Sequence, residues 1–418
     1  MNNNTSNIWH PLTQHKTYAD PLEISKAQGI FLYDANGNAY IDGISSWYTS
    51  TYGHCNPYII DKVKQQLDTL DQVVFTGFTH QPAIQLSKKL MEILPTAQSK
   101  IFFSDNGSTS VDIALKMAFQ YYYNKGDKRT KVIALEEGFH GDTFGAMSVS
   151  DLSVYNGPFE TFFLDVIRIP VPTAETIDAV EQQLSTIIKE NDIASFIYEP
   201  LVQGAAAMKI HDGVMMDRLL KICKTNNVLT IADEVMTGFG KTGTYFASDQ
   251  INTKPDIMCM AKSLTAGIAP MALTSCSQEV FDAFYDESIL KGFFHGHTYS
   301  ANPLACTAAL AGIELLTSEK IQEQIQMIEQ ENETFAQSIK DLDIVKTVKS
   351  KGVILSIELD IDADRYGDLR NKLYTFYMNN GVYLRPLGKV IYTLPPFIIT
   401  KEELHSIFDV ILASFKEI

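Results

Sequence analysis

Residues 228–234 read VLTIADE and residues 256–262 read DIMCMAK, and these two stretches decide the fold class. Each contains a short apolar run with the length of a buried strand, and each run leads into a charged side chain, Asp233 in the first and Lys262 in the second. A lysine is rarely placed at the end of a buried strand, because removing an ammonium group from water is costly. The carboxyl ends of parallel strands lie at one edge of a sheet, so we expect Asp233 and Lys262 in a single site.

Short apolar runs of this kind alternate with helical patterns through the middle of the chain. The expected strands are residues 100–103, 132–135, 162–169, 195–198, 228–232 and 256–260. The helical patterns that follow several of them cover residues 111–123, 176–189 and 213–224. This alternation predicts an α/β fold with a mainly parallel sheet flanked by helices.

The first part of the chain has a different pattern. Residues 1–28 are polar and irregular, which favours an arm. Residues 29–42 alternate apolar and polar side chains around Asn36-Gly37, which predicts a hairpin with a two-residue turn. Helical spacing follows at residues 58–70 and 83–94.

The last part of the chain predicts a smaller α+β domain. Its expected elements are a helical region at 305–342, a strand at 353–359, a helix at 366–379, and two strands at 382–385 and 390–393 that pair with each other. Thr400 and Glu403 form a capping box that opens a final helix. We therefore divide the chain into residues 1–60 (arm and part of the small domain), 61–310 (large domain) and 311–418 (C-terminal small domain).

Composition narrows the class of protein. The 418 residues carry a formal net charge of −16 and show no basic stripe, so we expect no nucleic-acid or anionic-membrane partner. The five cysteines include no C-x-x-C pair, and their odd number disfavours a disulfide framework. Residues 1–7 do not resemble a signal peptide, and the apolar stretch at 304–316 is too short to span a bilayer. These features favour a reduced, cytoplasmic protein.

The sequence SDNGSTS at residues 104–110 lies between an expected strand and an expected helix. Gly107 would let the backbone approach a ligand closely, and the free N–H groups of the helix start, with the Ser108 hydroxyl, could bind a phosphate. An ordinary helix N-cap explains the same residues, and for this motif taken alone it is the better explanation.

A lysine and a carboxylate at one sheet edge suit a pyridoxal phosphate site. Lys262 would form a Schiff base with the cofactor, and Asp233 would keep the pyridinium nitrogen protonated. Phe139, which follows another expected strand, could stack on one face of the ring, with Val235 on the other. Each residue also has a plainer explanation: a strand-end lysine in solvent, a helix N-cap, and a phenylalanine in the core.

Two other kinds of site deserve comparison. The sequence GFGKTG at 238–243 suggests a P-loop, but that motif needs glycine six positions before its lysine, where this chain has Val235. His295 and His297 suggest a metal, but no third ligand stands at a clear spacing, so we expect no metal site. Thr298, in the same segment, fits a phosphate donor.

Arg385 completes the set of candidate residues. Its forked guanidinium suits a substrate carboxylate, although a surface salt bridge is the simpler explanation for one arginine. The order along the chain is a phosphate loop, a stacking aromatic, an acid, a lysine, a threonine and an arginine. Together these groups supply every contact that the cofactor and an acidic substrate require.

This order resembles the class III, or ornithine/GABA-type, aminotransferases over essentially the whole chain. The strongest matches are IADEV at 231–235 leading to GFG at 238–240, and PD at 255–256 leading to AK at 261–262. Within this class the chain is most similar to the adenosylmethionine-8-amino-7-oxononanoate aminotransferases of biotin synthesis. That narrower resemblance rests on IWHP at 8–11, SSWY at 45–48, GDTFGAMS at 141–148, RPLGK at 385–389 and IYTLPP at 391–396.

The resemblance implies a pyridoxal phosphate-dependent transferase of fold type I. It implies a mainly parallel seven-stranded sheet in the large domain, a smaller α+β domain, and a homodimer with sites at the interface. The catalytic residues implied are Lys262, Asp233 and Tyr48. The cofactor-binding residues implied are Gly107, Ser108, Phe139, Asp233, Val235, Lys262 and Thr298, the last reaching into the site of the other subunit. The substrate-binding residues implied are Trp47, Tyr48, Asp142, Gly296, Arg385 and Tyr392.

The reaction implied is a ping-pong transamination of 8-amino-7-oxononanoate to 7,8-diaminononanoate, with S-adenosylmethionine as amino donor. The alternatives are lysine as donor, or another class III ω-aminotransferase acting on a diamine, ornithine or 4-aminobutyrate. Three positions depart from the pattern: Leu12 and Phe139 stand where tyrosine is common, and His297 stands where proline occurs. The tyrosine hydroxyls absent at positions 12 and 139 would lie near the amine end of the site, so their loss bears on the identity of the amino donor.

Overall fold

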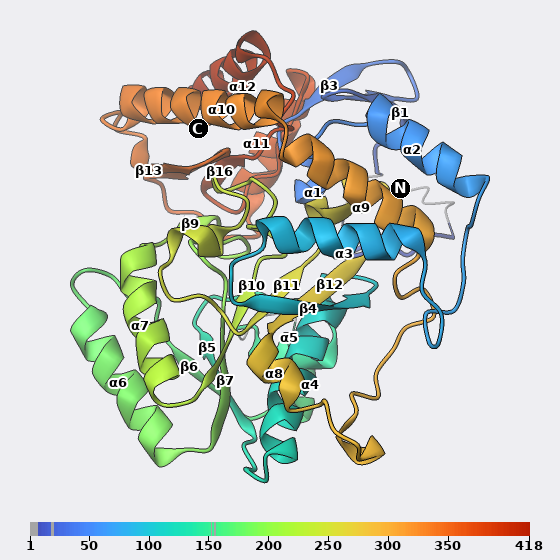
Figure 1. The fold of residues 1–418 in the computed structure, drawn as a ribbon. Helices are drawn as coiled ribbons and strands as arrows, with labels where there is room; N and C mark the ends of the chain where they lie inside the picture. Colours follow the sequence, from blue (N-terminus) through green and yellow to red (C-terminus); the bar gives the residue numbers. More distant parts are fainter. Residues whose placement is uncertain (1–6, 18–20, 152, 154–155) are drawn as a thin grey trace.

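The centre of the molecule is a seven-stranded sheet (Figure 1). The computed structural model describes residues 7–17, 21–151, 153 and 156–418. The strand order is β4 (Gln98–Ser104), β12 (Ala272–Ser277), β11 (Ile257–Met260), β10 (Leu229–Asp233), β7 (Ile193–Tyr198), β5 (Lys131–Leu135) and β6 (Val166–Ile169). β12 is antiparallel to both of its neighbours, and the other neighbouring pairs are parallel. The predicted α/β class and mainly parallel seven-stranded sheet are confirmed.

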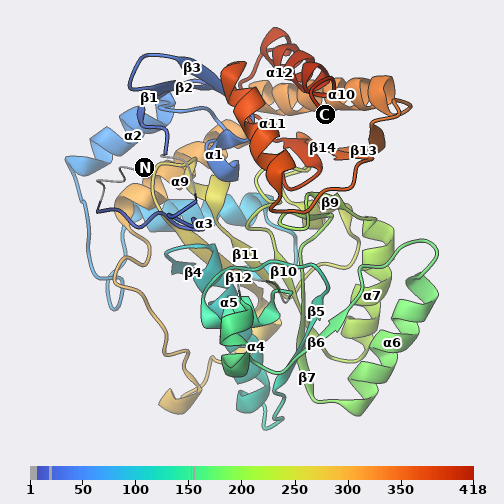
Figure 2. The same ribbon diagram turned by 180° about the vertical axis from the view of Figure 1, so that it is seen from behind.

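Both faces of the sheet are covered by helices, as Figures 1 and 2 show. Leu229 and Ile231 of β10 pack in a cluster with α4 (Gly107–Asn124), whereas Ala232 joins a larger cluster on the opposite face. The other helices of this part are α5 (Phe144–Val149), α6 (Ile177–Glu190), α7 (Gly213–Thr225) and α8 (Gln278–Asp282). Because both faces are buried, these strands read as continuous apolar runs.

Besides the short pair β8 (Val202–Gln203) and β9 (Lys209–Ile210), two smaller sheets lie beyond this core. The first has the order β1 (Ile24–Gln28), β2 (Phe31–Asp34), β3 (Ala39–Asp42), β15 (Val382–Tyr383), and the second has the order β13 (Val345–Lys351), β14 (Ile354–Leu359), β16 (Val390–Thr393). The accompanying helices are α2 (Pro57–Leu67), α3 (Gln81–Ile93), α9 (Pro303–Leu316), α10 (Glu319–Ile339), α11 (Asp368–Asn379) and α12 (Lys401–Ser414). The first sheet joins the start of the chain to its end. The domain boundaries at 60 and 310 stay a prediction.

Several predicted elements have different bounds or partners. Residues 162–169 contain only the short β6, preceded by a 3-10 helix at Gly157–Phe162. The region 305–342 is divided into α9 and α10, because Ser318 caps a new helix by accepting from the Ile321 N–H. The strand pair predicted at 382–385 and 390–393 is wrong, since β15 pairs with β3 and β16 pairs with β14.

The predicted hairpin of β2 and β3 is confirmed, but its turn is longer than expected. The Asp34 N–H donates to the Asn38 carbonyl at 3.0 Å, which leaves residues 35–37 as the loop. Gly37 has a φ of 87°, the left-handed conformation that closes such a loop. The capping box of the last helix is confirmed, with Thr400 Oγ1 accepting from the Glu403 N–H at 3.2 Å and Glu403 Oε2 accepting from the Thr400 N–H at 2.9 Å. Within the described ranges, no helix is long and apolar enough to cross a membrane.

Candidate active site

Lys262 and Asp233 lie on neighbouring strands, as the sequence predicts. β10 and β11 are parallel, and Asp233 at the end of β10 is level with Cys259, three residues before Lys262. Lys262 has a φ of 48°, a left-handed conformation that turns the chain sharply at the strand end. Burial lowers the pKa of Lys262, and the charges of Asp233 and Glu199 partly oppose this shift. The amine is therefore easier to deprotonate than a lysine in water.

Asp233 is buried and held by two hydrogen bonds. His140 Nδ1 donates to its Oδ2 at 2.7 Å, and the Val235 N–H donates to its Oδ1 at 3.1 Å. Each carboxylate oxygen keeps acceptor capacity for a further donor. His140 Nε2 is buried and makes no hydrogen bond with the described part of the chain. A buried carboxylate with spare acceptor capacity fits the protonated ring nitrogen of pyridoxal phosphate.

The predicted phosphate loop opens α4 and contacts two other predicted residues. Gly107 lies so close to Val235 that an added Cβ would approach its Cγ1 to 2.8 Å. Ser108 Oγ accepts from the Asp142 N–H at 3.1 Å. Asn106 and Thr109 form a capping box at the start of the same helix. The backbone and hydroxyl donors at this helix start suit a phosphate group. The hydrogen bond to Ser108 places Asp142 beside this phosphate loop.

Phe139 is part of the segment that carries His140. The residue is 42% exposed, and its N–H donates to Glu199 Oε1 at 3.0 Å. The next residue, His140, is the partner of Asp233. An exposed ring beside a buried acid is available to stack on a flat ligand.

Tyr48 lies next to the Lys262 amine. Lys262 Nζ is 4.9 Å from the centre of the Tyr48 ring, and the Tyr48 hydroxyl donates to the Tyr392 hydroxyl at 3.0 Å. Burial raises the pKa of Tyr48 well above 10 and that of Tyr392 to about 12. Both hydroxyls therefore keep their protons, and because the Tyr48 proton is donated to Tyr392, the Tyr48 oxygen is left to accept a hydrogen bond from a substrate.

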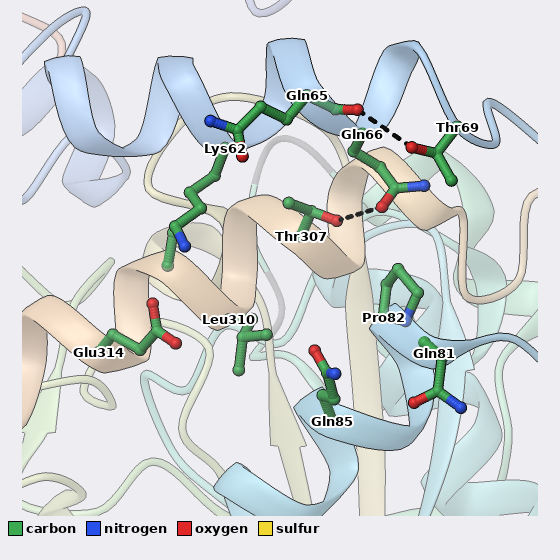
Figure 3. Close-up of a pocket in the computed structure, with 11 residues that line it drawn as sticks. Lys62, Gln65, Gln66, Thr69, Gln81, Pro82, Gln85, Thr307, Leu310 and Glu314 are labelled. Atoms are coloured by element: carbon green, nitrogen blue, oxygen red, sulfur yellow. Dashed lines mark hydrogen bonds between the residues drawn. The ribbon is translucent and has the colours of Figure 1, made fainter.

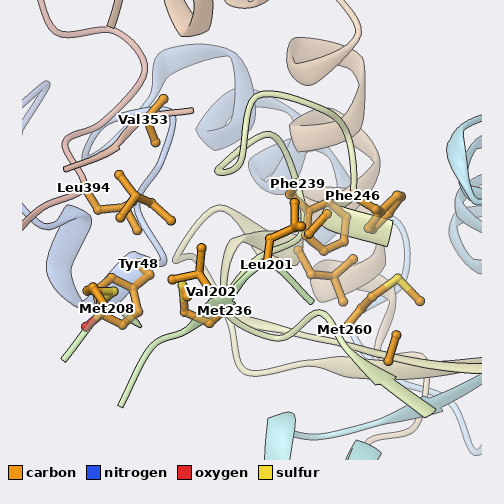
Figure 4. Packing of buried hydrophobic residues seen from close by; sticks show 14 of the residues in the cluster. Tyr48, Leu201, Val202, Met208, Met236, Phe239, Phe246, Met260, Val353 and Leu394 are labelled. Atoms are coloured by element: carbon orange, nitrogen blue, oxygen red, sulfur yellow. The ribbon is translucent and has the colours of Figure 1, made fainter. Parts of the chain in front are cut away.

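An unusual backbone turn places Tyr48 and Trp47. Residues Ser45–Tyr48 all have positive φ values, between 46° and 73°, which form a left-handed turn. Such a conformation costs roughly 1–2 kcal/mol per residue, so surrounding contacts must stabilise it. Ser45 Oγ donates to the Leu394 carbonyl at 2.8 Å, and Ser263 Oγ donates to the Tyr48 carbonyl at 2.7 Å. Figure 4 shows Tyr48 and Leu394 among the buried apolar side chains around this turn.

Trp47 and Arg385 contact each other close to Tyr48. The Arg385 guanidinium carbon lies 4.9 Å from the centre of the Trp47 ring. Arg385 also lines a small cavity of about 40 Å³ with Arg370, Tyr374 and Tyr383. The Arg385 guanidinium thus lies against Trp47, the residue beside Tyr48, whose ring faces the Lys262 amine.

Gly296 and Thr298 are exposed and lie in a loop that follows residue 292. The Thr298 carbonyl accepts from Gln72 Nε2 at 3.0 Å. Among the described contacts, neither residue touches Lys262 or Asp233. Their predicted roles at the site of a second subunit stay predictions.

Glu199 and Lys241 were not predicted as site residues. Glu199 follows β7 and accepts from the N–H groups of Phe139 and Gly204, each at 3.0 Å. Its position after an apolar run is the same signal that identified Asp233. Lys241 is fully buried, and its Nζ donates to Ser263 Oγ at 2.7 Å. Burial and the charge of Lys262 lower the pKa of Lys241 well below its ordinary value. The GFGKTG motif does not reveal that this lysine is buried beside Ser263.

Glu199 should make the stability of the protein depend on pH. Burial raises its pKa from 4.5 to about 7, so the folded chain holds a proton that the unfolded chain releases between these values. Stability is therefore lost as pH rises through this window. We expect the free energy of unfolding of wild type to fall by on the order of 3 kcal/mol between pH 5 and pH 8, relative to Glu199→Gln. Urea unfolding at both pH values measures this difference, and equal pH dependence in the two proteins would contradict it.

A separate polar cavity of about 290 Å³ lies among α2, α3 and α9 (Figure 3). Its lining includes Lys62, Gln66, Gln85 and Glu314. None of the predicted site residues lines it, so this cavity is distinct from the Lys262 site.

The profile of the family "Aminotransferase class-III" matches residues 13–415. The chain belongs to the class III aminotransferases. It is a pyridoxal phosphate-dependent transaminase. The buried Lys262 amine and the buried Asp233 carboxylate described above fit this cofactor.

Individual relatives and solved structures agree with this family. The chain is 38% identical to the adenosylmethionine-8-amino-7-oxononanoate aminotransferase of Synechococcus elongatus, over 98% of this chain and 99% of the relative. It is 35% identical to the Staphylococcus aureus enzyme of the same name, over 95% and 92%. The crystal structure of the enzyme of this name from Methanocaldococcus jannaschii has 35% identity and a TM-score of 0.93, over 98% and 97%. An amine transaminase from an uncultivated Pseudomonas species, in its PLP-bound form, has 28% identity and a TM-score of 0.92, with 99% of each chain covered.

Proposed function

We propose that this class III aminotransferase converts 8-amino-7-oxononanoate to 7,8-diaminononanoate, with S-adenosylmethionine as the amino donor. The observation that carries the proposal is the line of side chains from Lys262 through Tyr48 and Trp47 to Arg385. The names of the relatives at 34–38% identity support the same pair of substrates.

Arg385 would bind the carboxylate of the keto substrate. A guanidinium offers paired donors to a carboxylate, and its position against Trp47 holds the fork in one plane. The Trp47 ring, 45% exposed, would cover the methylene chain, since each buried CH₂ contributes about 0.8 kcal/mol. A shorter substrate would leave this apolar surface uncovered.

Lys262 and its neighbours would carry the proton transfers. Pyridoxal phosphate, when bound, takes the amino group from the donor and passes it to the keto substrate. Lys262 Nζ, with its lowered pKa, would move a proton between the donor carbon and the cofactor carbon. Asp233 would hold the proton of the ring nitrogen, and His140 keeps Asp233 oriented. The Tyr48 oxygen, whose proton is donated to Tyr392, would accept a hydrogen bond from the substrate amine.

The working form would be a homodimer. Large apolar side chains before and after Thr298 are strongly exposed: Tyr285 80%, Ile289 73%, Leu290 83%, Phe294 72% and Tyr299 62%. Exposed apolar residues at this density favour a protein interface. A second copy covering this segment would place Thr298 beside the phosphate of the partner's site. The cytoplasm would be the compartment, which the five free cysteines support.

A half-reaction screen tests the substrates. The holoenzyme is mixed separately with S-adenosylmethionine, lysine, ornithine and 4-aminobutyrate, and the spectrum of the pyridoxamine form is followed. We expect S-adenosylmethionine to react and 8-amino-7-oxononanoate to reverse the change. If lysine is the only amine that reacts, lysine would replace S-adenosylmethionine as the proposed donor. Reaction with ornithine or 4-aminobutyrate, without amination of 8-amino-7-oxononanoate, would assign another ω-aminotransferase.

Replacing Arg385 tests the carboxylate site. Arg385→Ala should raise the KM for 8-amino-7-oxononanoate about 10- to 100-fold, because a hydrogen bond to a charged group contributes about 1.5–3 kcal/mol. Arg385→Lys should recover part of this loss, since it keeps the charge without the fork. Steady-state kinetics measure the effect. Arg129→Ala, which removes an arginine paired with Asp127, is the matched control. Equal KM values in wild type and Arg385→Ala would contradict the assignment.

A further inference from the structure

Four side chains outside the catalytic line form a continuous chain of contacts. Lys116 Nζ lies 2.8 Å from His295 Nδ1, and His295 Nε2 lies 3.0 Å from His297 Nε2. His297 Nδ1 lies 3.3 Å from Asp105 Oδ2. The chain therefore connects α4, the loop that carries Thr298, and the turn that precedes Gly107.

The chemistry of Lys116 fixes the direction of the two hydrogen bonds in this chain. A lysine ammonium only donates, so His295 Nδ1 must accept. The proton of a neutral His295 then sits on Nε2, which donates to His297 Nε2. The last link, from His297 Nδ1 to the Asp105 carboxylate at 3.3 Å, is an ion-pair contact and not an aligned hydrogen bond. A second proton on His295 would occupy Nδ1 and break its hydrogen bond with Lys116.

The loop has further anchors on both sides of Thr298. Gln120 Nε2 donates to the Gly292 carbonyl at 2.8 Å, and Ser300 Oγ donates to the Phe103 carbonyl at 3.3 Å. The His295 ring stacks on Phe293 with 5.9 Å between ring centres. Between these anchors, His295 and His297 hold the residues just before Thr298, whereas Thr298 itself is exposed.

We propose that Lys116, His295, His297 and Asp105 are positioning residues that set Thr298 for binding the cofactor phosphate of the partner's site. The inference rests on the proposed homodimer. The same chain ends at Asp105, two residues before Gly107 in the phosphate loop of its own subunit. It therefore also links two parts of one subunit: the loop with Thr298, which would serve the partner's site, and the turn before Gly107, which would serve the subunit's own site.

Protonation should open this chain. The titratable and charged groups facing His295 are Lys116 and His297, and Phe102 and Phe293 cover it with apolar surface. Asp112, one turn before Lys116 on α4, is the other charge close to that lysine. Burial, Lys116 and His297 together lower the pKa of His295 below 6.5, so the chain is intact at neutral pH. The stabilisation that the chain contributes is lost as the pH falls below about 6.5 and through the lowered pKa of His295.

The test is the rate at which pyridoxal phosphate leaves the holoenzyme, measured at pH 8 and pH 5.5 by absorbance after gel filtration. At pH 8, His295→Phe and Lys116→Met should each lose cofactor about 10-fold faster than wild type. At pH 5.5 the ratio should be smaller than at pH 8, because protonation of His295 opens the chain in a larger fraction of wild type. His405→Phe, which removes an imidazole paired with Glu331 on α10, should match wild type at both pH values.

Thr298→Val separates this inference from the proposed function. If the chain acts through Thr298, the double variant Thr298→Val/His295→Phe should lose cofactor no faster than Thr298→Val alone. A fast Thr298→Val with a wild-type rate for both His295→Phe and Lys116→Met would overturn the inference and leave the proposed function standing. Additive effects of Thr298→Val and His295→Phe would also overturn it. A wild-type rate for Thr298→Val would instead remove Thr298 from the proposed site. If His295→Phe does not fold, Lys116→Met carries the same comparisons.

Discussion

Lys262→Ala should reduce transamination about 10⁴-fold or more, because one side chain supplies both the nucleophilic amine and the proton carrier. Burial lowers the pKa of Lys262, which makes the free amine that both roles require easier to form. The rate of the half-reaction with S-adenosylmethionine, followed by absorbance, measures the loss. Borohydride should fix the cofactor covalently to the peptide that contains Lys262 in wild type, and not in the variant.

Lys221→Ala is the matched control for this experiment. Lys221 is a solvent-exposed lysine of α7 that pairs with Asp217, so its removal should leave the half-reaction unchanged. A Lys262→Ala protein that keeps a rate within tenfold of wild type would remove Lys262 from the reaction. Labelling of another lysine by borohydride would have the same consequence.

Asp233→Asn should reduce transamination about 10²- to 10³-fold, the range typical for removing one preorganised electrostatic partner of a transition state. The amide keeps the size of the carboxylate, and its oxygen can still accept from His140 Nδ1, at the loss of one hydrogen bond from the Val235 N–H, which the amide NH2 group cannot accept. The fold should therefore persist, whereas the negative charge opposite the ring nitrogen is lost. Single-turnover rates of both half-reactions measure the effect, since both depend on the protonated ring.

Asp217→Asn provides the comparison for Asp233→Asn. Asp217 is also a buried carboxylate with a backbone donor, the Thr253 N–H at 2.6 Å, but it lies on α7 away from Lys262. It should change stability without changing the single-turnover rates. Rates for Asp233→Asn within threefold of wild type would show that its charge has no part in the chemistry.

Most strands of the central sheet were predictable from the sequence, and the exception is β12. β10 and β11 stand out because buried parallel strands are apolar over their whole length. β12, Ala272–Ser277, is also buried, yet its sequence ALTSCS gives no apolar run. Its polar side chains are satisfied by distant partners, for example Ser275 Oγ on Gln98 and Thr274 Oγ1 on the Ser110 carbonyl. Those partners become visible only when the strands are side by side.

The small sheets show the same limit for pairing. The sequence predicts that 382–385 and 390–393 are strands, and their proximity along the chain favours a hairpin. β15 instead pairs with β3 from the start of the chain, and β16 pairs with β14. Strand patterns specify which residues face the core, but several partners can satisfy the same pattern.

The α/β class, the acid and the lysine at two strand ends, and the family could all be inferred from the sequence. These features depend on local patterns, on strand ends that share one sheet edge, and on motif order. The left-handed turn at Ser45–Tyr48, the His140–Asp233 pair and the chain from Lys116 to Asp105 are visible only in the folded protein. Each of these depends on groups far apart in the sequence, or on a backbone conformation that those contacts stabilise. Lys262 could therefore be recognised from its strand, whereas the environment that sets its pKa comes from contacts made across the whole chain.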